Sequence, residues 1–500
     1  MFPHQSANLV RYACHSSHLA SVKPFHEIPT SDPSFPLFAM ITQLSKYFAK
    51  SPLFKIHEEN REKYYRYGPI VRETRFWQQP IVQIFDPKDF EKVFRKQGKC
   101  PNRPPNEFVI KYRKQNPQLY SNVGMSNMLG EDWLKERALV APTLLSSSTI
   151  KLYLRRQDEL AHDFVSFLEY RSTASPAGCI DDLLEVTNRY SVDSISMMCL
   201  DSRLNCLSID SPTRDGDQLT KLTKTLFEAY QELYHGFPLW KYMDTRSFRK
   251  FCRTESKIYN LITPHIQRAV KHLEGQSSRL PECLLELLLR TPGLNHRDVH
   301  ILLLDFIVGG VNTVSTSLCF LLFLLASNPQ SQERLYQEIS STIKDSTPIS
   351  EDHLSKLPYM KACLKESFRM ISVVPNLVRI LDQPIILSNY EIPAGIPIIL
   401  NFDALCKHGQ YFQDPEVFYP ERWLGERRKQ IHPFSVLPFG LGNRMCAGRR
   451  ISEIELYLAM IRTIANFKLE STIKDLKLRQ DFILVPAEKV KIRLIRRRET

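Results

Sequence analysis

The clearest chemical signal in this 500-residue chain is a cysteine near its carboxyl end. Cys446 lies in the segment LPFGLGNRMCAGRR, residues 437–450, and apolar residues recur at helical spacing after it. This spacing predicts a loop that opens directly into a helix, with the thiol at the helix amino terminus. The helix dipole and unpaired backbone N–H groups lower a thiol pKa there, and Arg444 supplies a nearby cation. A thiolate held in this way is suited to bind the iron of a haem.

Glycines on both sides of the cysteine allow the backbone to approach a flat ligand closely. A buried cysteine beside a glycine-rich turn is the alternative, but six residue types match one pattern at fixed offsets. They are Phe439, Gly440, Gly442, Arg444, Cys446 and Gly448. This pattern resembles the haem-binding segment of the cytochromes P450, and the resemblance covers nearly the whole chain. It implies a haem b cofactor with Cys446 as the iron ligand and with Phe439 and Arg444 beside it.

Two further groups of residues match the family at the expected places. Glu366 and Arg369, in KESFR, are one helical turn apart, and Arg422 lies in PERW. An isolated Glu-x-x-Arg pair is usually a weak surface ion pair. The resemblance implies instead that the three residues form a buried structural cluster beneath the haem. It also implies contacts to the haem propionates from three more residues: Trp133, Arg137 and Arg379.

An uncharged run from Phe306 to Pro329 is long enough to span a bilayer, yet its middle, GGVNTVST, is polar. On a helix, the small and polar residues of this segment share one face: Gly309, Asn312, Thr313 and Thr316. The chain offers no second span against which such a face could be hidden. We therefore expect a long core helix that crosses the haem, with the glycines leaving room for dioxygen and substrate.

The family pattern at this place has an acid followed by two threonines, and this chain departs from it. Asn312 replaces the acid and Val314 the second threonine, while Thr313 is retained. An amide can orient water but cannot exchange a proton near neutral pH. Our hypothesis is that Asn312 orders water that delivers protons to Thr313, with Thr316 as a second hydroxyl. Two alternatives stay open: an isomerase or dehydratase that needs no external electrons, and a haem-binding protein without turnover.

Four basic residues could form a docking surface for an electron donor. Lys361 and Lys365 lie one turn apart on a helix face directed away from the Glu366 cluster, and Arg449 and Arg450 follow the cysteine. An ordinary solvated basic face is the alternative. The arrangement resembles the mitochondrial class of animal cytochromes P450, which implies docking of an acidic ferredoxin.

The amino-terminal segment is rich in serine and has no acidic residue before Glu27. This composition predicts a mitochondrial presequence over residues 1–25, with a plain disordered tail as the alternative. The motifs KPFHEIP and GRRISEIE resemble the mitochondrial class as well. The amino-terminal segment shows no long apolar run that could serve as a secretory signal or anchor helix.

The segment HGFPLWKYM, residues 235–243, resembles the region through which the family contacts membranes. It brings Phe237, Leu239 and Trp240 close to basic residues. Core packing between helices is the alternative. We expect peripheral membrane contact through this segment.

The net charge of +13 comes from 67 basic and 54 acidic residues that are dispersed along the chain. No zinc-finger spacing or RNA-binding aromatic motif accompanies them, so we do not expect nucleic acid as a partner. An acidic protein or a membrane surface suits the charge better. The eleven cysteines show no CxxC motif, which predicts free thiols in a reducing compartment.

The patterns along the chain predict a mainly helical, α-rich α+β protein with one domain over residues 26–500. Strands are expected around Ile70, at 81–85 and in pieces over 377–402, and the tail, 482–498, alternates like a final hairpin. The segment 170–178, YRSTASPAG, reads as a loop between helices.

The resemblance implies a monooxygenase that uses O2 and ferredoxin electrons to hydroxylate a lipophilic substrate. The expected place is the matrix side of the mitochondrial inner membrane. The overall likeness suggests a sterol- or steroid-directed member, most similar to the arthropod ecdysteroid hydroxylases.

Overall fold

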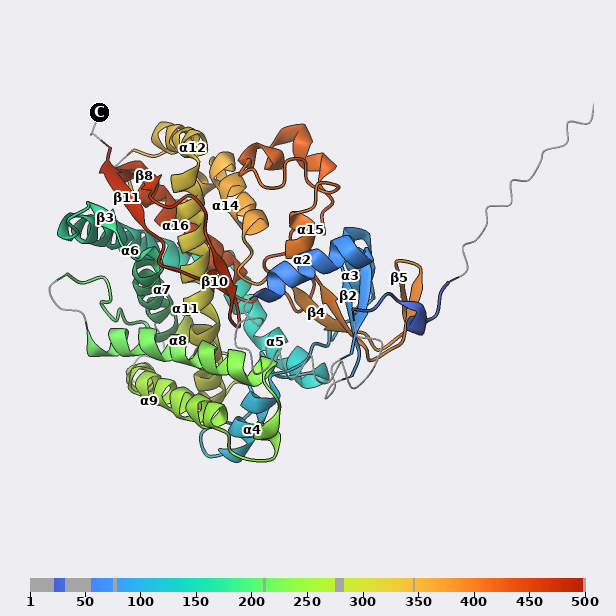
Figure 1. Cartoon of the computed structure of the whole chain (residues 1–500). Helices are drawn as coiled ribbons and strands as arrows, with labels where there is room; N and C mark the ends of the chain where they lie inside the picture. The colour runs from blue at the N-terminus through green and yellow to red at the C-terminus, as the bar shows by residue number, and fades with distance from the viewer. Residues whose placement is uncertain are drawn as a thin grey trace, which may run out of the picture.

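The computed structural model arranges the helices around one long central helix, with the largest sheet at one side (Figure 1). It describes residues 22–31, 55–74, 79–209, 213–274, 283–344 and 347–497. Residues 1–21, most of the expected presequence, lie outside the described residues. Helices dominate and the described strands form small separate sheets, which confirms the α-rich α+β fold that the sequence predicts.

The helices carry most of the described chain. The α-helices are α2 (Ile56–Tyr67), α3 (Pro87–Lys96), α4 (Glu107–Gln115), α5 (Gly130–Leu145), α6 (Ser147–Ala174), α7 (Leu183–Leu200), α8 (Arg214–His235), α9 (Arg246–Glu274), α10 (Leu284–Leu289), α11 (His296–Ser327), α12 (Pro329–Thr342), α13 (Glu351–Ser355), α14 (Pro358–Met370), α15 (Phe402–Cys406) and α16 (Arg449–Asn466). Short 3-10 helices are η1 (Phe25–Glu27), η3 (Leu239–Lys241), η4 (Pro420–Trp423) and η5 (Gly425–Gln430). Because α6 continues to Ala174, the expected loop at 170–178 is shorter than predicted.

The largest sheet joins β1 (Ile70–Glu73), β2 (Ile81–Ile84), β7 (Pro397–Leu400) and β4 (Leu377–Ile380), in that order. The β2–β7 pair is parallel, and the other two pairs are antiparallel. Smaller sheets pair β5 (Ile385–Leu387) with β6 (Tyr390–Ile392), and β9 (Leu478–Gln480) with β10 (Leu484–Pro486). The remaining sheet has β11 (Ile492–Arg496) between β3 (Cys179–Ile180) and β8 (Phe467–Ser471).

The predicted hairpin at the end of the chain is wrong, because β10 and β11 belong to different sheets. The Leu484 N–H donates to the Val373 carbonyl at 2.8 Å, which holds β10 against the loop after α14. β11 pairs instead with the strand that directly follows α16. Alternation along the sequence indicates strands, but long-range hydrogen bonds choose their partners.

The central helix, α11, is the longest apolar element of the structure. It begins at a capping box in which Asn295 and Asp298 satisfy each other's backbone N–H groups. Helices α7, α16, α9 and α8 all pack against it. It is the one described helix that is long and apolar enough to cross a membrane. Of its most apolar stretch of 18 residues, 72% is buried inside the protein. This burial supports the prediction of a core helix.

The segment that follows the expected presequence is part of the folded body. Lys23 donates its N–H to the Asn389 carbonyl and accepts from the Glu391 N–H, both at 2.9 Å, beside β6. Ile28 is 2% exposed, and the Pro29 carbonyl accepts from Arg72 of β1 at 2.8 Å. The backbone from Lys23 to Pro29 is therefore held by two sheets.

A buried carboxylate joins α14 to η4. Glu366 accepts two hydrogen bonds from Arg369 and one from Arg422, all at 2.9 Å, and one from the Trp423 indole at 2.8 Å. Both Glu366 and Arg369 are fully buried. The remaining guanidinium N–H groups donate to backbone carbonyls, including those of Cys406, Pro415 and Gln413. The structure thus brings together the three residues expected to form a structural cluster.

Replacing Glu366 by Gln should destabilise the protein strongly. The change keeps the size of the side chain but leaves two buried guanidinium groups without a negative partner. Breaking a buried ion pair in this way costs about 3–5 kcal/mol of unfolding free energy. Thermal unfolding of the purified protein would measure the loss. The control, Glu426→Gln, alters a carboxylate that is 84% exposed and should stay within about 0.5 kcal/mol of wild type. Equal stability of the two variants would contradict this reading of the cluster.

Candidate active site

The loop before α16 is shaped by two glycines. Gly440 and Gly442 have φ angles of +70° and +77°, which residues with a side chain rarely adopt. A Cβ atom on Gly442 would also clash with the side-chain amide of Gln97. The loop closes where the Cys446 N–H donates to the Phe439 carbonyl at 2.8 Å. This turn presents Cys446 immediately ahead of α16.

The Cys446 side chain is accessible but set deep in the protein. Burial raises the pKa of its thiol, while the Gly448 N–H, Arg137, Arg103 and Arg449 act in the opposite direction. The prediction of a lowered thiol pKa is therefore wrong for the chain by itself. The physical reason is that Cys446 lies before the first turn of α16, where the helix offsets only part of the cost of burial. A bound metal ion would deprotonate such a thiol outright.

Arginines gather beside the cysteine without carboxylate partners. Arg137 and Arg379, expected from the sequence, lie near Arg444, and so does Arg103. None of the four forms an ion pair with a carboxylate of the described residues. Burial and the other three arginines lower the pKa of Arg444 to about 9. Burial and Arg103 likewise lower the pKa of Arg379 to about 10. The cluster is thus a site of uncompensated positive charge.

Backbone carbonyls and an indole ring hold the arginines in place. Arg444 donates to the Met128 carbonyl at 2.6 Å, and its guanidinium carbon lies 4.6 Å from the centre of the Trp133 ring. Arg137 donates to the Met445 carbonyl, one residue before the cysteine, at 3.1 Å. The Nε atom of Arg444 is buried and has no partner among the described atoms. A ligand with two carboxylates, such as haem, would supply the missing negative charge and acceptors.

Sequence reasoning missed Arg103, because no local pattern marks it. The residue lies in a proline-rich loop before α4 and donates to the Ser126 carbonyl at 2.7 Å. Burial lowers the pKa of the Arg103 guanidinium, and the charges of Asp305 on α11 and of Cys446 act in the opposite direction. Arg103 therefore lies between the central helix and the cysteine loop.

Helix α11 is buried along most of its length except for one stripe. The residues that stay partly accessible in its middle are Asp305, Phe306, Gly309, Gly310 and Thr313, which we call the open stripe. A Cβ atom on Gly309 would meet only open space, whereas one on Gly310 would lie 2.7 Å from Cδ1 of Ile195. The first glycine therefore keeps the stripe open, and the second permits close packing against α7.

The residues of the predicted polar face of α11 lie in two different environments. Thr313 belongs to the open stripe, and its hydroxyl donates to the Gly309 carbonyl at 2.8 Å. Asn312 is buried, and its amide donates to the Thr223 carbonyl of α8 at 3.1 Å. Thr316 is 2% exposed. The structure therefore places Gly309 and Thr313 on the open side and turns Asn312 and Thr316 into the helix packing.

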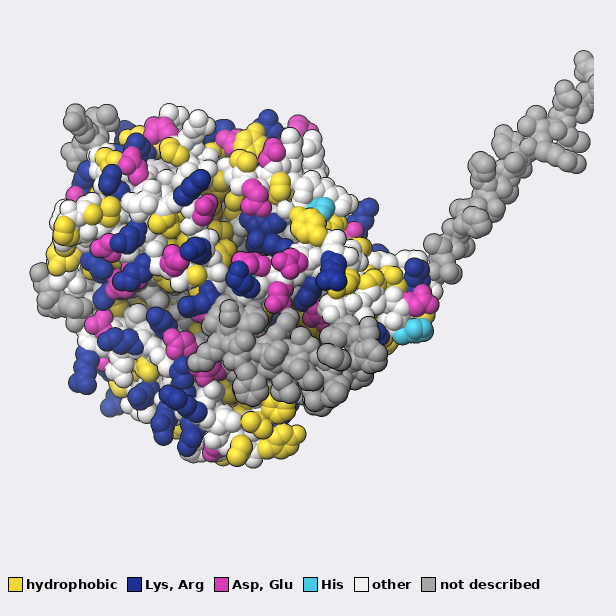
Figure 2. Space-filling view, viewed as in Figure 1, with side chains coloured by type: hydrophobic (Ala, Val, Ile, Leu, Met, Phe, Trp, Pro, Cys, Tyr) yellow, Lys and Arg dark blue, Asp and Glu magenta, His cyan; other side chains and the backbone are white. Residues whose placement is uncertain are grey.

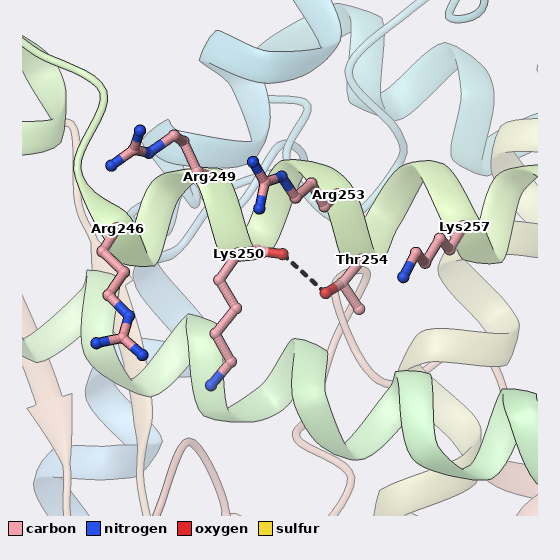
Figure 3. Close-up of a pocket in the computed structure, with 6 residues that line it drawn as sticks. All are labelled: Arg246, Arg249, Lys250, Arg253, Thr254 and Lys257. Atoms are coloured by element: carbon pink, nitrogen blue, oxygen red, sulfur yellow. Dashed lines mark hydrogen bonds between the residues drawn. The ribbon is translucent and has the colours of Figure 1, made fainter.

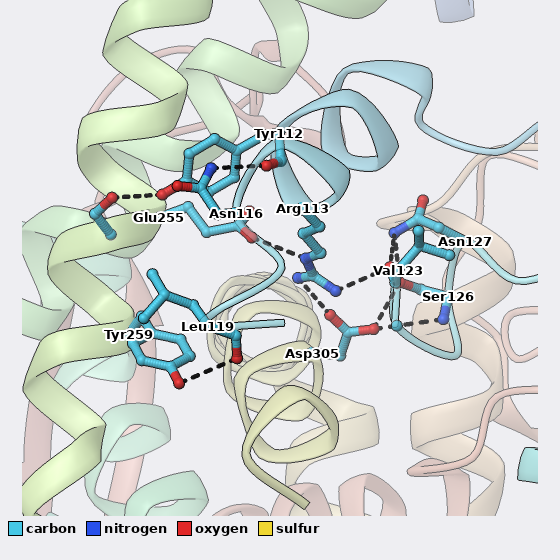
Figure 4. A network of polar contacts seen from close by, with 12 residues as sticks. Tyr112, Arg113, Asn116, Leu119, Val123, Ser126, Asn127, Glu255, Tyr259 and Asp305 are labelled. Carbon is cyan, nitrogen blue, oxygen red and sulfur yellow. Dashed lines mark hydrogen bonds and ion pairs between the residues drawn. The ribbon is translucent and has the colours of Figure 1, made fainter. Parts of the chain in front are cut away.

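A buried ionic network that the sequence did not reveal lies at the amino-terminal end of the open stripe, around Asp305 (Figure 4). Asp305 accepts from Arg113 of α4 and from the Ser126 hydroxyl, both at 2.8 Å. Arg113 also donates to Glu255 of α9 at 2.8 Å. Because three separate elements share these charges, the loop over 116–129 is held against α11. Only long-range contacts join these residues, so no local motif could predict them.

The predicted electron-donor surface is only partly assembled as expected. Burial, Arg428 and Arg449 all lower the pKa of Lys365, whose ammonium lies 4.3 Å from the centre of the Trp423 ring. Lys361 is exposed one turn away, and Arg450 is exposed on the first turn of α16. The sequence GERRKQ in η5 contributes exposed cations that were missed, although their charge run was visible. Lys365, Arg428 and Arg449 form the centre of the surface.

These observations fit a haem held by Cys446: an accessible deep thiol, arginines that lack carboxylates, and a glycine-bearing stripe on a buried helix. Residues 29–494 match the family model described as "Cytochrome P450". The chain belongs to the cytochrome P450 family. Its cofactor is a haem with cysteine thiolate ligation, and it is an oxidoreductase of the monooxygenase type. In such an enzyme, electrons reach the haem from a redox partner.

The relatives extend over almost the whole chain. "Cytochrome P450 302a1, mitochondrial" of Drosophila melanogaster is 29% identical over 92% of this chain and 93% of its own. "Ecdysone 20-monooxygenase" of the same species is 29% identical over 90% and 84%. "Probable cytochrome P450 CYP44" of Caenorhabditis elegans is 31% identical over 92% and 91%. The solved structure of the cytochrome P450DA heme domain superposes with a TM-score of 0.76 at 20% identity, covering 96% and 98% of the two chains, which shows the shared fold.

Replacing Arg444 by Gln should weaken haem retention without weakening the haem-free fold. The change removes a donor for a carboxylate, and a hydrogen bond to a charged group contributes about 1.5–3 kcal/mol. We expect roughly 10–100-fold faster transfer of haem to excess apomyoglobin, as this energy implies. The unfolding free energy of the haem-free protein should not fall, because one of four repelling charges is gone. Arg95→Gln, at an exposed position paired with Glu91, is the control and should leave both quantities unchanged.

Proposed function

We propose that the protein hydroxylates a lipophilic substrate of the sterol or steroid class, using O2 and electrons from a mitochondrial ferredoxin. The observation that carries the proposal is the accessible thiol of Cys446 beside an arginine cluster and the open stripe of α11. The helix that carries the stripe is itself largely apolar, which suits a lipophile. The names of relatives, which include a mitochondrial cytochrome P450 and an ecdysone monooxygenase, support the compartment and the substrate class.

When bound, the haem supplies the activation of dioxygen and the oxidising power. The residues of the chain hold it and tune it. The Cys446 thiolate would bind the haem iron and supply electron density to it. Arg444, Arg137 and Arg379, joined by Arg103, provide the positive charge that two propionate groups require.

Proton handling falls to Thr313 on the open side. Its hydroxyl hydrogen is engaged with the Gly309 carbonyl, which leaves the oxygen free to accept a hydrogen bond from water. We assign Asn312 a different role from the one that the sequence suggests, because its amide donates a hydrogen bond to the Thr223 carbonyl of α8. We infer that Asn312 fixes α11 against α8 and so positions Thr313, while solvent in the open stripe carries the proton.

The electron donor would dock on the surface formed by Lys365, Arg428 and Arg449, with Lys361 and Arg450 at its edge. Surface cations of this kind steer an acidic ferredoxin and set its orientation. Arg449 follows Cys446 by only three residues and begins α16. A donor seated there would be close to Cys446.

We place the protein on the matrix side of the mitochondrial inner membrane, with a presequence that is removed on import. Its expected boundary at residue 25 needs adjustment, because the backbone of Lys23 is hydrogen-bonded on both sides to the β5–β6 hairpin. A cut after residue 25 would remove these contacts. We infer that the mature chain begins before Lys23.

The proposal is tested by reconstituting the full chain with a mitochondrial ferredoxin, its reductase and NADPH, and by supplying a panel of sterols and ecdysteroid precursors. Mass spectrometry should find a product that has gained one oxygen atom, formed only when the electron donors are present. Asn312 in place of the family's acid favours one second candidate, an isomerase or dehydratase. Such an enzyme would convert its substrate without NADPH, and that result would replace our proposal.

Charge reversal at Arg428 should weaken docking of the electron donor. Arg428→Glu puts a like charge opposite an acidic ferredoxin, so we expect KM for ferredoxin to rise by about tenfold or more. The kcat at saturating ferredoxin should change little, because the haem site is untouched. The control, Arg155→Glu, reverses a charge that is 84% exposed on α6. An equal rise in KM for both variants would mean that only the net charge of the protein matters. That result would contradict a specific docking surface around Arg428.

Substitutions on α11 separate the roles of Thr313 and Asn312. Thr313→Ala should lower product formation and increase the hydrogen peroxide released per NADPH, because the open stripe loses its hydroxyl. Asn312→Asp replaces the donor to the Thr223 carbonyl by an acceptor, so we expect a loss of roughly 1–3 kcal/mol in unfolding free energy. If Asn312→Asp instead raised product yield at unchanged stability, Asn312 would lie on the proton path and our assignment would be wrong.

A further inference from the structure

The loop over 116–129, between α4 and α5, contacts both parts of the candidate active site. Its Ser126 hydroxyl donates to Asp305, the first residue of the open stripe, at 2.8 Å. The Ser126 carbonyl accepts from Arg103, a member of the arginine cluster, at 2.7 Å. A movement of this loop would therefore affect the open stripe and the arginines together.

A single amide group holds the middle of this loop to two helices. The Nδ2 atom of Asn122 donates to Oε2 of Glu136 on α5 at 3.3 Å and to Oδ1 of Asp298 on α11 at 3.2 Å. The side-chain oxygen of Asn122 accepts from the Gly124 N–H at 2.8 Å. The Ser121 hydroxyl is a second donor to Asp298, at 2.6 Å. Asn122 therefore joins two carboxylates from separate helices through one donor group.

Glu136 is the member of this contact whose charge is not compensated. The residue is 8% exposed, and its Oε1 atom is buried without a hydrogen-bond partner among the described atoms. It forms no ion pair with a basic side chain of the described residues. Burial, Asp298 and Asp305 raise the pKa of Glu136 to about 7. Ionising this carboxyl adds a like charge beside two aspartates.

Two aspartates of α11 are the charged groups that act on Glu136. Asp305 is already paired with Arg113 of α4 at 2.8 Å, and Arg113 also pairs with Glu255 of α9 at 2.8 Å (Figure 4). The buried Arg113 is thus shared by two carboxylates, and neither of them is Glu136. A negative charge on Glu136 would therefore meet Asp298 and Asp305 without a cation of its own.

The other charged side chains near this contact are directed elsewhere. Arg137, the next residue of α5, donates to a carbonyl of the cysteine loop at 3.1 Å. Arg297 donates to a carbonyl of the 116–129 loop at 3.3 Å, and the ring of His300 stacks on Tyr259 with centroids 3.8 Å apart. The charged and titratable residues around α10 and on the first turns of α11 that do not act on this carboxyl are Glu286, Arg290, His296, Arg297 and His300.

Helix α9 supplies Glu255 to the network but no positive charge to Glu136. Its exposed cations lie on the solvent side of the helix (Figure 3) and are Arg246, Arg249, Arg253 and Lys257. In the space-filling view, Lys and Arg side chains gather at the lower end of the molecule (Figure 2), where α9 lies in Figure 1. Because these cations face solvent, they leave the buried carboxylates uncompensated.

We propose that Glu136 and Asn122 form a pH-sensitive latch that controls how the 116–129 loop covers the open stripe. With a neutral Glu136, the Asn122 amide holds α5, the loop and α11 together. When Glu136 loses its proton to solvent, its carboxylate repels the two aspartates of α11 and the loop is released. This inference rests on the proposed function, which places the substrate at the open stripe. It adds that protonation of a carboxyl outside the haem contacts sets how readily the substrate enters.

The direction of the pH effect follows from the two states of the loop. Opening exposes Glu136 to water, where a glutamate has a pKa of about 4.3. Because the closed loop raises the pKa of Glu136 to about 7, the closed form binds more protons between these two values and loses population as the pH rises through them. This linkage makes opening about tenfold more favourable at about pH 8 than at about pH 6. At higher pH the carboxyl is ionised in both states, and the effect levels off.

The test is amide hydrogen exchange of the full-length haem-loaded protein, read by mass spectrometry on peptides from the 116–129 loop. After correction for the intrinsic pH dependence of exchange, protection in wild type should fall about tenfold from about pH 6 to about pH 8. Glu136→Gln keeps the size of the side chain and an acceptor for Asn122 but cannot ionise. Its protection should stay within about twofold over the same range. A wild-type loop whose protection does not change would by itself overturn the proposal.

The matched control is Glu131→Gln, the same change at an exposed position on the first turn of α5. It should keep the wild-type pH dependence. A second variant, Asn122→Ala, removes the shared donor and should lower the protection of the loop already at about pH 6. Carbon monoxide difference spectra establish that each variant holds its haem-thiolate centre. A pH-dependent loss of protection that persists in Glu136→Gln, or that disappears in Glu131→Gln, would overturn the proposal.

Control of entry is tested with a bulky triazole, a haem ligand that does not titrate in this pH range. Its association rate, followed by haem absorbance, should rise about tenfold from about pH 6 to about pH 8 in wild type and stay constant in Glu136→Gln. Equal rates at both pH values in wild type would overturn the proposed control of entry. Neither measurement uses ferredoxin, NADPH or a steroid. A failure of the latch therefore stays distinct from a failure of the proposed function, which is judged by the oxygenated product.

Discussion

Positive charge buried without a matching carboxylate is the constraint on which the haem site depends. Burial and neighbouring arginines lower the pKa of Arg444 and of Arg379, and an uncompensated buried charge is costly. Backbone carbonyls of Pro101, Met128 and Met445 offset part of that cost by accepting hydrogen bonds. These carbonyls come from three loops at separate places in the sequence. The loops must therefore converge for the arginines to be tolerated, and a dianionic cofactor that neutralises the charge stabilises their convergence.

The opposite arrangement is a buried carboxylate that accepts hydrogen bonds from several donors. It fixes the position of the side chains around Lys365. Glu366 binds Arg369 and Arg422, and it also accepts from the Trp423 indole. The face of that indole ring lies against the Lys365 ammonium at 4.3 Å. One buried carboxylate thus fixes the ring against which a surface cation rests. The stability of the core and the position of Lys365 are therefore linked by two contacts, the Trp423–Glu366 hydrogen bond and the packing of Lys365 on the Trp423 ring.

What could be predicted from the sequence is local, and what could not is long-range. The geometry of the Glu366–Arg369 pair follows from helix periodicity, because the two residues are one turn apart on α14, and the Cys446 loop is marked by its local glycine pattern. The face of α11 could not be resolved in this way, because Asn312 and Thr313 differ by about 100° on a helix and only the packing of α8 decides which one is buried. Arg103 reaches the cluster from a loop with no repeating pattern. The partner strands of the tail were missed for the same reason.

Net charge alone could not sort the partners of this protein, since basic surfaces occur on both α14 and α9. The difference lies in what accompanies the charge. Around Lys365 the cations rest on a saturated network and an indole ring, which gives fixed positions for a protein partner to match. Around Arg249 the nearby chain segment carries the exposed side chains of Tyr242 and Met243 and offers no comparable network among the described residues. On our proposal, the electron donor would therefore approach the side of α14, at the other end of the view from α9 (Figure 1).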